Sequence, residues 1–154
     1  MTDRRAADEV RVGASPGQIW AVLHDPVALR RILPGCESAD EVAADRYRLV
    51  LATRVALFTV RADVDAAYLD ADPPRHLRLE LNGRPRGFDG SFHASIPFDL
   101  SPVEGGRATL VRYSLTVETT GAMGMLGPGA IHGAVASQVG GLVRDLEREA
   151  AGRG

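Results

Sequence analysis

The sequence predicts an α+β domain in which a curved antiparallel sheet wraps around one long C-terminal helix. Three observations lead to this prediction. Two short helix starts follow each other within residues 15–37, most of residues 46–117 alternates between apolar and polar side chains, and the apolar spacing changes over 128–149 to steps of three and four residues. Alternation with period two is typical of half-buried strands, and steps of three and four residues are typical of an amphipathic helix.

Two short helices are predicted one directly after the other. Ser15 can cap the first, because Gln18 lies three residues further on, where a capping box requires it. Asp25 can cap the second, and a proline follows each cap at the first helical position, where its missing N–H costs nothing. Pro34-Gly35 then ends the second helix and turns the chain. We expect the pair to close one side of an apolar pocket.

The strands are predicted over residues 7–13, 36–42, 46–53, 55–70, 76–82, 88–100 and 109–117. The segment 46–53 shows the pattern, since Tyr47, Leu49 and Leu51 lie on one face and Arg46 and Arg48 on the other. Asn82-Gly83 is a strong signal for a hairpin turn. We expect an antiparallel meander with a polar outer face and an apolar inner face.

The final helix is predicted over residues 128–149, and at about 1.5 Å per residue it is long enough to cross a sheet. Because a strongly twisted sheet curls, this helix can lie in the curl, which is the helix-grip arrangement. Three glycines lie within the helix, and each costs up to about 1 kcal/mol relative to alanine. Gly133, Gly140 and Gly141 therefore indicate a close approach to another backbone, or space kept open beneath the helix.

Composition limits the classes of function. We expect one domain over residues 1–154, with 6–150 as the ordered core and flexible termini. The net charge is −2 and no face collects a basic run, so nucleic acid is not an expected partner. Cys36 is the single cysteine, which excludes an intrachain disulfide and a cysteine metal site. The charged N-terminus has no signal-peptide core, and no apolar run approaches the ~20 residues of a membrane span, so we expect a cytoplasmic protein.

The inward register of the strands and final helix defines a candidate ligand cavity. Ligand cavities are mostly apolar with a few polar groups that fix orientation. Only 5% of the residues are aromatic, and small residues fall in the inward registers, so volume is left unfilled. The cavity is predicted to be lined by Leu49, Leu51, Val60, Leu79, Phe92, Ala94, Tyr113, Leu115, Val135, Gln138 and Val139, with Tyr113 and Gln138 as the polar groups. Its rim or gate is predicted at Trp20, Leu33, Met123, Met125, Leu126 and His132. The alternative for these residues is a solid core.

No catalytic or metal-binding constellation is present in the sequence. The four histidines are far apart and have no metal-ligand spacing, and no serine lies in a nucleophile motif. We therefore assign no catalytic residue and no metal. No cofactor is expected apart from a bound quinone or lipid.

The stretch from residue 16 to residue 37 contains a pattern that combines Pro16, Ile19, Trp20, Leu23, Asp25, Pro26, Leu29, Pro34, Gly35, Cys36 and Glu37. In these positions it resembles the CoxG-like family of carbon monoxide dehydrogenase subunits, within the Bet v 1/START-like (SRPBCC) superfamily. Two weaker matches are Asp72-Pro73-Pro74-Arg75 before a strand, and Leu126-Gly127 followed by Ile131, Gly133 and Ala134. The similarity spans residues 9–148.

This resemblance implies a helix-grip fold with a deep apolar cavity. It also implies a non-catalytic accessory or carrier role for a carbon monoxide dehydrogenase-type molybdenum hydroxylase, with a lipid or quinone-like ligand and peripheral contact at the inner face of the membrane. Members that bind membrane often carry a long C-terminal extension, whereas this chain stops at Gly154, and Arg54 to Phe58 replaces the usual lysine-bearing strand. These departures bear on membrane recruitment and not on ligand binding.

Two other functions fit the same sequence. A polyketide cyclase/aromatase-like enzyme would need polar groups placed inside the cavity to handle protons, and Tyr113, Arg54 or His132 would have to point inward together. An adaptor would have a vestigial cavity and would recruit a partner through its surface.

Overall fold

The computed structural model describes residues 4–55, 57–126 and 129–152. Its elements, in chain order, are β1 (Arg4–Val12), α1 (Pro16–Leu23), α2 (Pro26–Ile32), β2 (Cys36–Ala43), β3 (Arg46–Val55), β4 (Phe58–Asp72), β5 (His76–Pro85), β6 (Ser91–Val103), the 3₁₀ turn η1 (Glu104–Gly106), β7 (Ala108–Thr120), the 3₁₀ turn η2 (Gly121–Leu126) and α3 (Ala130–Ala151). Within the described part of the chain, no helix is both long and apolar enough to cross a membrane.

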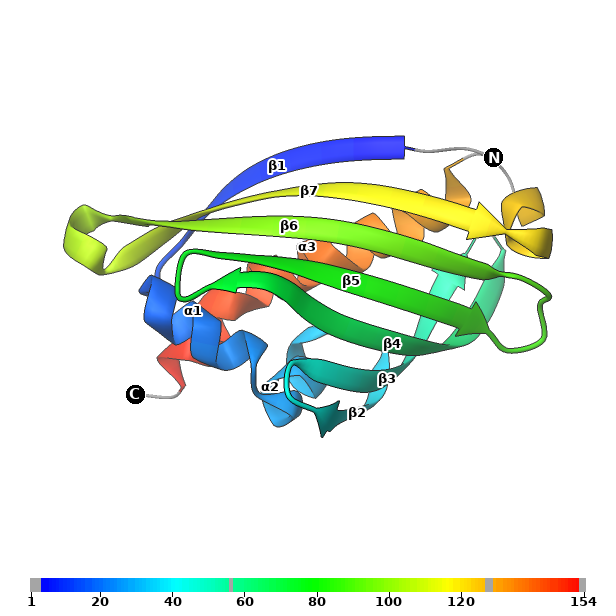
Figure 1. Ribbon diagram of the computed structural model, residues 1–154, viewed down its shortest axis with the longest axis horizontal. Coiled ribbons are helices and arrows are strands. Elements are labelled where there is room, and N and C mark those ends of the chain that lie inside the picture. The colour runs from blue at the N-terminus through cyan, green and yellow to red at the C-terminus, as the bar shows by residue number, and fades with distance from the viewer. Residues whose placement is uncertain (1–3, 56, 127–128, 153–154) are drawn as a thin grey trace.

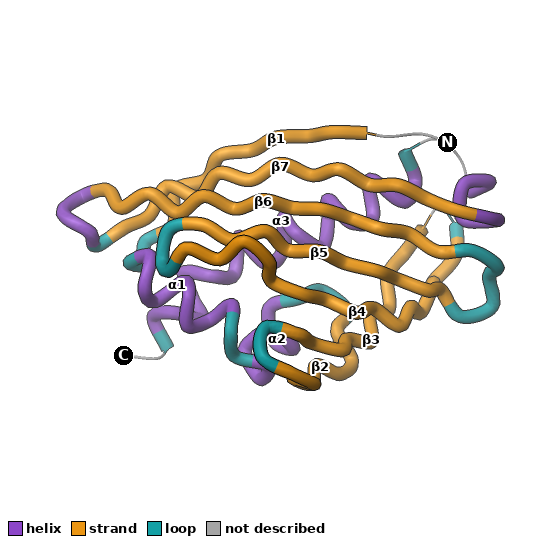
Figure 2. Tube along the Cα trace, viewed as in Figure 1, coloured by secondary structure: helices purple, strands orange, loops and turns teal. Residues whose placement is uncertain are grey.

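The strands form one seven-stranded sheet in the order β1-β7-β6-β5-β4-β3-β2. Every neighbouring pair is antiparallel. The long helix α3 lies along one face of this sheet, and α1 and α2 cover one end of it (Figure 1). The turn between β5 and β6 lies at the opposite end (Figure 2). The turn η2 lies at that end too, because Ser91 at the start of β6 pairs with Thr120 just before η2. This is the predicted helix-grip arrangement.

The helix pair forms with the caps that the sequence predicts. The Ser15 hydroxyl accepts a hydrogen bond from the backbone N–H of Gln18 at 3.2 Å, and the Gln18 side chain accepts one from the Ser15 N–H at 2.8 Å. The Asp25 carboxylate accepts from the N–H groups of Val27 and Ala28. These bonds satisfy donors that the first turn of a helix leaves unpaired, so the positions where the two helices begin are fixed locally.

The Asn82-Gly83 turn prediction is wrong. β5 continues through these residues to Pro85, and Gly83 pairs with Phe92 of β6. A Cβ atom on Gly83 would lie 2.0 Å from the ring of Phe92, so any side chain here would have to displace that ring. Glycine stands here because the Phe92 ring lies across the strand, and not because the chain turns.

One of the three α3 glycines lies at a close approach. A Cβ atom on Gly141 would lie 2.4 Å from Cγ of Pro34, just after α2. A Cβ atom on Gly133 would meet nothing within 4 Å. The close approach predicted for this helix therefore occurs at Gly141. The sequence predicts another backbone as the partner, but the structure shows the side-chain ring of Pro34.

Candidate functional site

Two apolar cavities lie between α3 and the sheet. The first has a volume of about 50 Å³ and is lined by Leu51, Thr53, Val60, Ala62, Val64, Leu81, Pro85, Phe92, Met123, Ile131, Ala134, Val135 and Gln138. The second has a volume of about 40 Å³ and is lined by Leu23, Leu29, Leu33, Tyr47, Leu49, Leu51, Ala66, Tyr68, Leu79, Leu81, Phe98, Gln138, Val139 and Leu142. The first extends toward η2, and the second toward α1 and α2.

The two cavities adjoin, because Leu51, Leu81 and Gln138 line both. Among the described residues, their strand lining comes from β3, β4, β5 and β6, and none of it from β1 or β7. α3 also packs against β1 and β7, where inward side chains such as Leu115 and Val117 are buried without lining either cavity. The unfilled space therefore lies over the half of the sheet that includes β3, β4 and β5.

Each of these cavities is smaller than the roughly 300–1,000 Å³ of pockets that hold drug-sized ligands. The resemblance implies one deep cavity, whereas these described side chains enclose two small ones in series. A lipid-sized ligand could enter only if lining side chains moved. Met123 and Phe92 line the first cavity, and methionine in particular adapts to irregular apolar partners.

Eight of the eleven residues predicted for the cavity line one or both of these spaces. They are Leu49, Leu51, Val60, Leu79, Phe92, Val135, Gln138 and Val139. Ala94, Tyr113 and Leu115 line neither. Ala94 and Leu115 are 0% and 2% exposed, so they belong to the solid core beneath α3. Sequence reasoning misses lining residues such as Leu81, Ala66 and Phe98, although the same inward register contains them.

The sequence predicts that Tyr113 orients a ligand, but the structure places its hydroxyl elsewhere. The hydroxyl donates to Asp8 at 3.4 Å, and the ring packs on Phe98 with 5.5 Å between ring centroids. Burial and the Asp8 carboxylate raise the pKa of Tyr113. Because β1 pairs with β7 and brings Asp8 beside Tyr113, this hydroxyl is engaged at the edge of the sheet.

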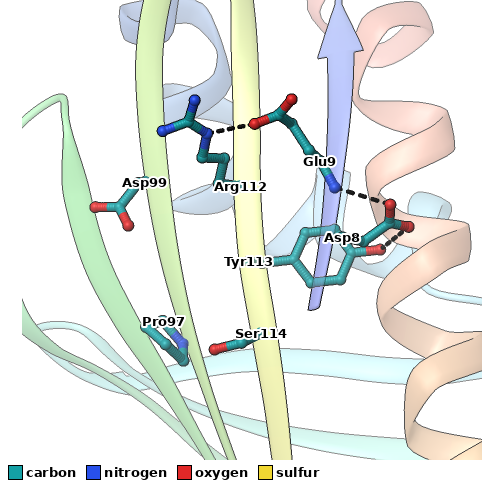
Figure 3. A pocket seen from close by; sticks show the side chains of 7 residues that line it. All are labelled: Asp8, Glu9, Pro97, Asp99, Arg112, Tyr113 and Ser114. Atoms are coloured by element: carbon teal, nitrogen blue, oxygen red, sulfur yellow. Dashed lines mark hydrogen bonds and ion pairs between the residues drawn. The ribbon is translucent and has the colours of Figure 1, made fainter. Parts of the chain in front are cut away.

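Tyr113 also borders a groove that is open to solvent (Figure 3). The groove is lined by Asp8, Glu9, Pro97, Asp99, Arg112, Tyr113 and Ser114. Its carboxylates are engaged: Glu9 pairs with Arg112, Asp99 pairs with His76, and Asp8 accepts from the Glu9 N–H as well as from Tyr113. Because each acid already has a partner, this groove is a weaker candidate for a ligand site than the apolar cavities.

The six predicted rim residues separate into different environments. Leu33 lines the second cavity, and Met123, only 3% exposed, lines the first. Trp20 lines neither cavity, and its ring stacks on His24 with 5.0 Å between centroids. Met125 is 85% exposed and His132 is half-buried, and neither lines these cavities. The side chain of Leu126 lies outside the described residues.

Two tyrosines close the second cavity near α1. The Tyr68 hydroxyl donates to the Leu23 carbonyl at 2.5 Å, and the Tyr47 hydroxyl donates to the His24 carbonyl at 3.3 Å. These carbonyls belong to the end of α1, where helical partners are missing. Burial raises the pKa of Tyr47 to about 12. Both hydroxyls therefore hold the helix pair in place and are poor proton donors at neutral pH.

Gln138 lines both cavities with the apolar part of its side chain. The side chain is 8% exposed, and its Nε2 donates to the Pro34 carbonyl at 2.7 Å. Its Oε1 is buried and has no hydrogen-bond partner in the described structure. A buried acceptor without a partner costs about 1–3 kcal/mol. This amide therefore joins α3 to the end of the helix pair, and the surface that it offers to the cavities is apolar.

A second polar cluster involves Glu80, His93 and Ser95 on neighbouring strands. The Glu80 carboxylate accepts from Ser95 at 2.5 Å and bonds His93 at 2.7 Å. Both oxygens of the Glu80 carboxylate are thus engaged, one by Ser95 and the other by His93, and none of these three residues lines the apolar cavities. No group of three or more His, Cys, Asp or Glu residues that could hold a metal ion occurs among the described residues.

Comparison with known proteins gives a family and a fold. The model of the CoxG family, which describes a carbon monoxide dehydrogenase subunit, matches residues 9–151. No curated protein matches the chain. A conserved protein from Geobacillus kaustophilus superposes with a TM-score of 0.83 at 22% identity, covering 96% of this chain and 95% of that one.

Two further solved structures are similar. The Zhui aromatase/cyclase from Streptomyces sp. R1128 has a TM-score of 0.71 at 17% identity and covers 99% of this chain and 96% of its own. A START superfamily protein from Mycobacterium smegmatis has a TM-score of 0.69 at 16% identity, with coverage of 97% and 99%. At these identities the similarity concerns the fold, which is of the START/Bet v 1-like type.

Proposed function

This chain belongs to the CoxG family of carbon monoxide dehydrogenase subunits, and we propose that it binds a small hydrophobic ligand, lipid-like or quinone-like, between α3 and the sheet. In this proposal it is an accessory or carrier protein for a carbon monoxide dehydrogenase-type molybdenum hydroxylase and carries out no chemistry itself. The observation that carries the proposal is the pair of adjoining apolar cavities between α3 and the sheet.

The energetics of the cavities support a ligand. Side chains that line an empty cavity lose dispersion contacts and transfer free energy. A protein with two adjoining empty cavities is therefore less stable than one in which the same space is filled. A hydrophobic ligand would restore these contacts and would gain about 25 cal/mol for each Å² of apolar surface that it removes from water. The proposed ligand-bound form is an expanded one in which a single space replaces the two cavities.

We place the protein in the cytoplasm, in peripheral contact with the inner face of the membrane. Leu57, in the connection between β3 and β4, is 88% exposed, and Met125 in η2 is 85% exposed. The first cavity is lined by Thr53 and Val60, four and three residues from Leu57, and by Met123, two residues from Met125. Two apolar side chains beside the same cavity suit brief contact with a lipid surface from which a ligand could be taken up.

An enzymatic role of the aromatase/cyclase kind has less support. It would require Tyr113, Arg54 and His132 to act together inside the cavity. Tyr113 donates to Asp8, Arg54 is exposed, and His132 lines neither cavity. The tyrosines that do line the second cavity donate to α1 carbonyls. An adaptor with a vestigial cavity is the other alternative, and the following experiment separates it from a carrier.

Native mass spectrometry of the protein incubated with a total lipid extract tests the proposal. We expect an apolar adduct on the wild-type protein. Ala134 lines the first cavity, whereas Ser137 on the same helix is exposed. The adduct should be lost in Ala134→Trp and retained in Ser137→Trp. An adduct that survives in Ala134→Trp, or that never forms, would contradict ligand binding between α3 and the sheet.

A further inference from the structure

His24 lies at the corner between α1 and α2, which consists of residues 23–25. The Tyr68 hydroxyl donates to the Leu23 carbonyl, and the Tyr47 hydroxyl donates to the His24 carbonyl. Leu23, Tyr47 and Tyr68 all line the second cavity. The corner therefore forms part of the wall of this cavity, and the contacts that hold it on the sheet keep that wall in place.

Both ring nitrogens of His24 lie close to oxygen atoms that accept hydrogen bonds. Nδ1 is 2.8 Å from the Trp20 carbonyl oxygen, and Nε2 is 3.2 Å from the Asp45 carboxylate. Because a carbonyl oxygen can only accept, Nδ1 carries a proton. In the neutral ring, Nε2 would then have a lone pair facing the carboxylate, with no proton between them. Both contacts are attractive only when the ring is doubly protonated and positively charged.

The surroundings of the ring favour the same cation. The rings of Trp20 and Tyr68 lie 5.0 Å and 4.7 Å from the His24 ring, centroid to centroid, and an aromatic face attracts a cation within about 6 Å. His24 also caps the C-terminal end of α1, where the helix dipole favours positive charge. The charged and titratable groups around the corner are Asp25 and Arg31 of α2 and its cap, Glu41 of β2, Asp45 of the β2–β3 turn, Tyr47 of β3 and Tyr68 of β4. Arg31 is already engaged by Glu149 of α3, so the carboxylates dominate.

Asp45 belongs to the sheet, whereas the His24 ring belongs to the helix pair. The Asp45 carbonyl accepts the backbone N–H of Tyr68 at 3.0 Å, which fixes the turn on β4. The ion pair therefore connects the corner to the sheet, as the two tyrosine hydroxyls do. Burial keeps the proton on Tyr47 by raising its pKa to about 12, whereas a histidine changes its charge between about pH 5 and pH 8.

We infer that protonation of His24 holds the corner on the sheet, so that the second cavity is closed more firmly in acid than at neutral or alkaline pH. The contact stabilises the closed corner while Nε2 carries its proton, and this contribution is lost as the pH rises and the proton leaves. The inference concerns the protein without a ligand. Its consequence, slower ligand release in acid, rests on the proposed function.

The fluorescence of Trp20 tests the protonation directly. Trp20 is the single tryptophan, and its ring stacks on His24. A cationic imidazole quenches an indole that it contacts far more than a neutral one does, so emission should fall between about pH 8 and about pH 5. This fall should disappear in His24→Gln and should need more acid in Asp45→Asn, where asparagine suits the left-handed backbone of the turn. Asp99→Asn, which removes the carboxylate of the separate His76–Asp99 pair, should keep the wild-type curve.

Hydrogen exchange measures the corner itself. The N–H of His24 donates to the Trp20 carbonyl and the N–H of Asp25 to the Val22 carbonyl, both at 3.2 Å. After correction for intrinsic exchange, the protection of these amides should be about two- to fivefold higher near pH 5 than near pH 8, the range expected of one ion pair. Asp45→Asn should remove this difference, and Asp99→Asn should keep it. Equal protection at both pH values in the wild type, or a difference that Asp45→Asn retains, would overturn the inference.

The release of 1-naphthol, a small aromatic probe, separates the inference from the proposed function. Release measured by stopped flow should be slower in acid by the same factor in the wild type, and Asp45→Asn should remove the difference. If the protection depends on pH and on Asp45 but naphthol does not bind, the proposed function fails and the inference stands. If naphthol binds, and neither its release nor the protection depends on Asp45, the inference fails and ligand binding stands.

Discussion

The ring of Pro34 packs on Gly141, at a distance that leaves no room for a Cβ atom. Through this contact the segment that follows α2 packs directly against one turn of α3. The same turn brings Gln138 to the Pro34 carbonyl. One proline therefore sets both the distance between these elements and the orientation of the buried amide.

Gly141→Ala is expected to destabilise the protein. Its Cβ would lie 2.4 Å from Pro34 Cγ, and forced contacts of this kind cost about 1–3 kcal/mol, offset in part by the better helix propensity of alanine. Gly133→Ala is the matched control on the same helix, because its Cβ would meet nothing within 4 Å. In urea unfolding, the free energy of unfolding should be lower than wild type for Gly141→Ala and higher by up to about 1 kcal/mol for Gly133→Ala. Equal effects at both positions would refute the close approach.

Gly83→Ala should affect ligand binding more than stability. The new Cβ would displace the Phe92 ring, whose outer atoms lie 2.0 Å from its position. The ring borders the first cavity and can swing into it, which would fill the space. Titration with 1-naphthol should show weaker binding to Gly83→Ala and recovery in Gly83→Ala combined with Phe92→Leu. Failure of the second change to restore binding would contradict this packing relationship.

The architecture of the sheet can be predicted from the sequence because it follows from local patterns. The capping groups at Ser15 and Asp25 and the period-two registers depend on neighbouring residues, and the structure contains them. The turn prediction at Gly83 fails, because a glycine beneath a cross-strand phenylalanine and a glycine in a turn look alike until the strand pairing is known. Tyr113 has the inward register, but its partner Asp8 comes from a strand about a hundred residues away in sequence. Which inward residues border unfilled space depends on where α3 lies, and no local pattern encodes that position.

Alkaline pH should destabilise the protein through Tyr47. Burial raises its pKa to about 12 in the folded state, whereas an unfolded tyrosine ionises near about 10. Between these values the unfolded state has lost a proton that the folded state keeps, so stability falls as the pH rises from about 10 to about 12. Urea unfolding at a series of pH values between about 10 and about 12 should show that the free energy of unfolding falls less for Tyr47→Phe than for the wild-type protein. Identical slopes above pH 10 for both proteins would count against a buried hydroxyl.

Acid should weaken the contact between Glu37 and Arg61, which joins β2 to β4 at distances of 2.7 Å and 2.6 Å. The hydrogen bond from Arg61 lowers the pKa of Glu37 below its ordinary value of 4.5. The contribution to stability is therefore present above that value and is lost as the pH falls through the lower, folded-state pKa. In acid, the free energy of unfolding of Arg61→Gln should depend less steeply on pH than that of the wild-type protein, as measured by urea unfolding. Arg54→Gln removes the same charge at another exposed position and should leave the dependence unchanged.

The central claim is that a hydrophobic ligand enters between α3 and the sheet, and methyl NMR of the wild-type protein titrated with 1-naphthol tests it most directly. The account predicts shifts at the methyl groups of Leu51, Leu81, Ile131 and Val135, which line the cavities. It predicts no shifts at Val27 and Val42, which are 61% and 53% exposed. Saturable shifts confined to exposed methyl groups, with the lining methyls unchanged, would contradict it.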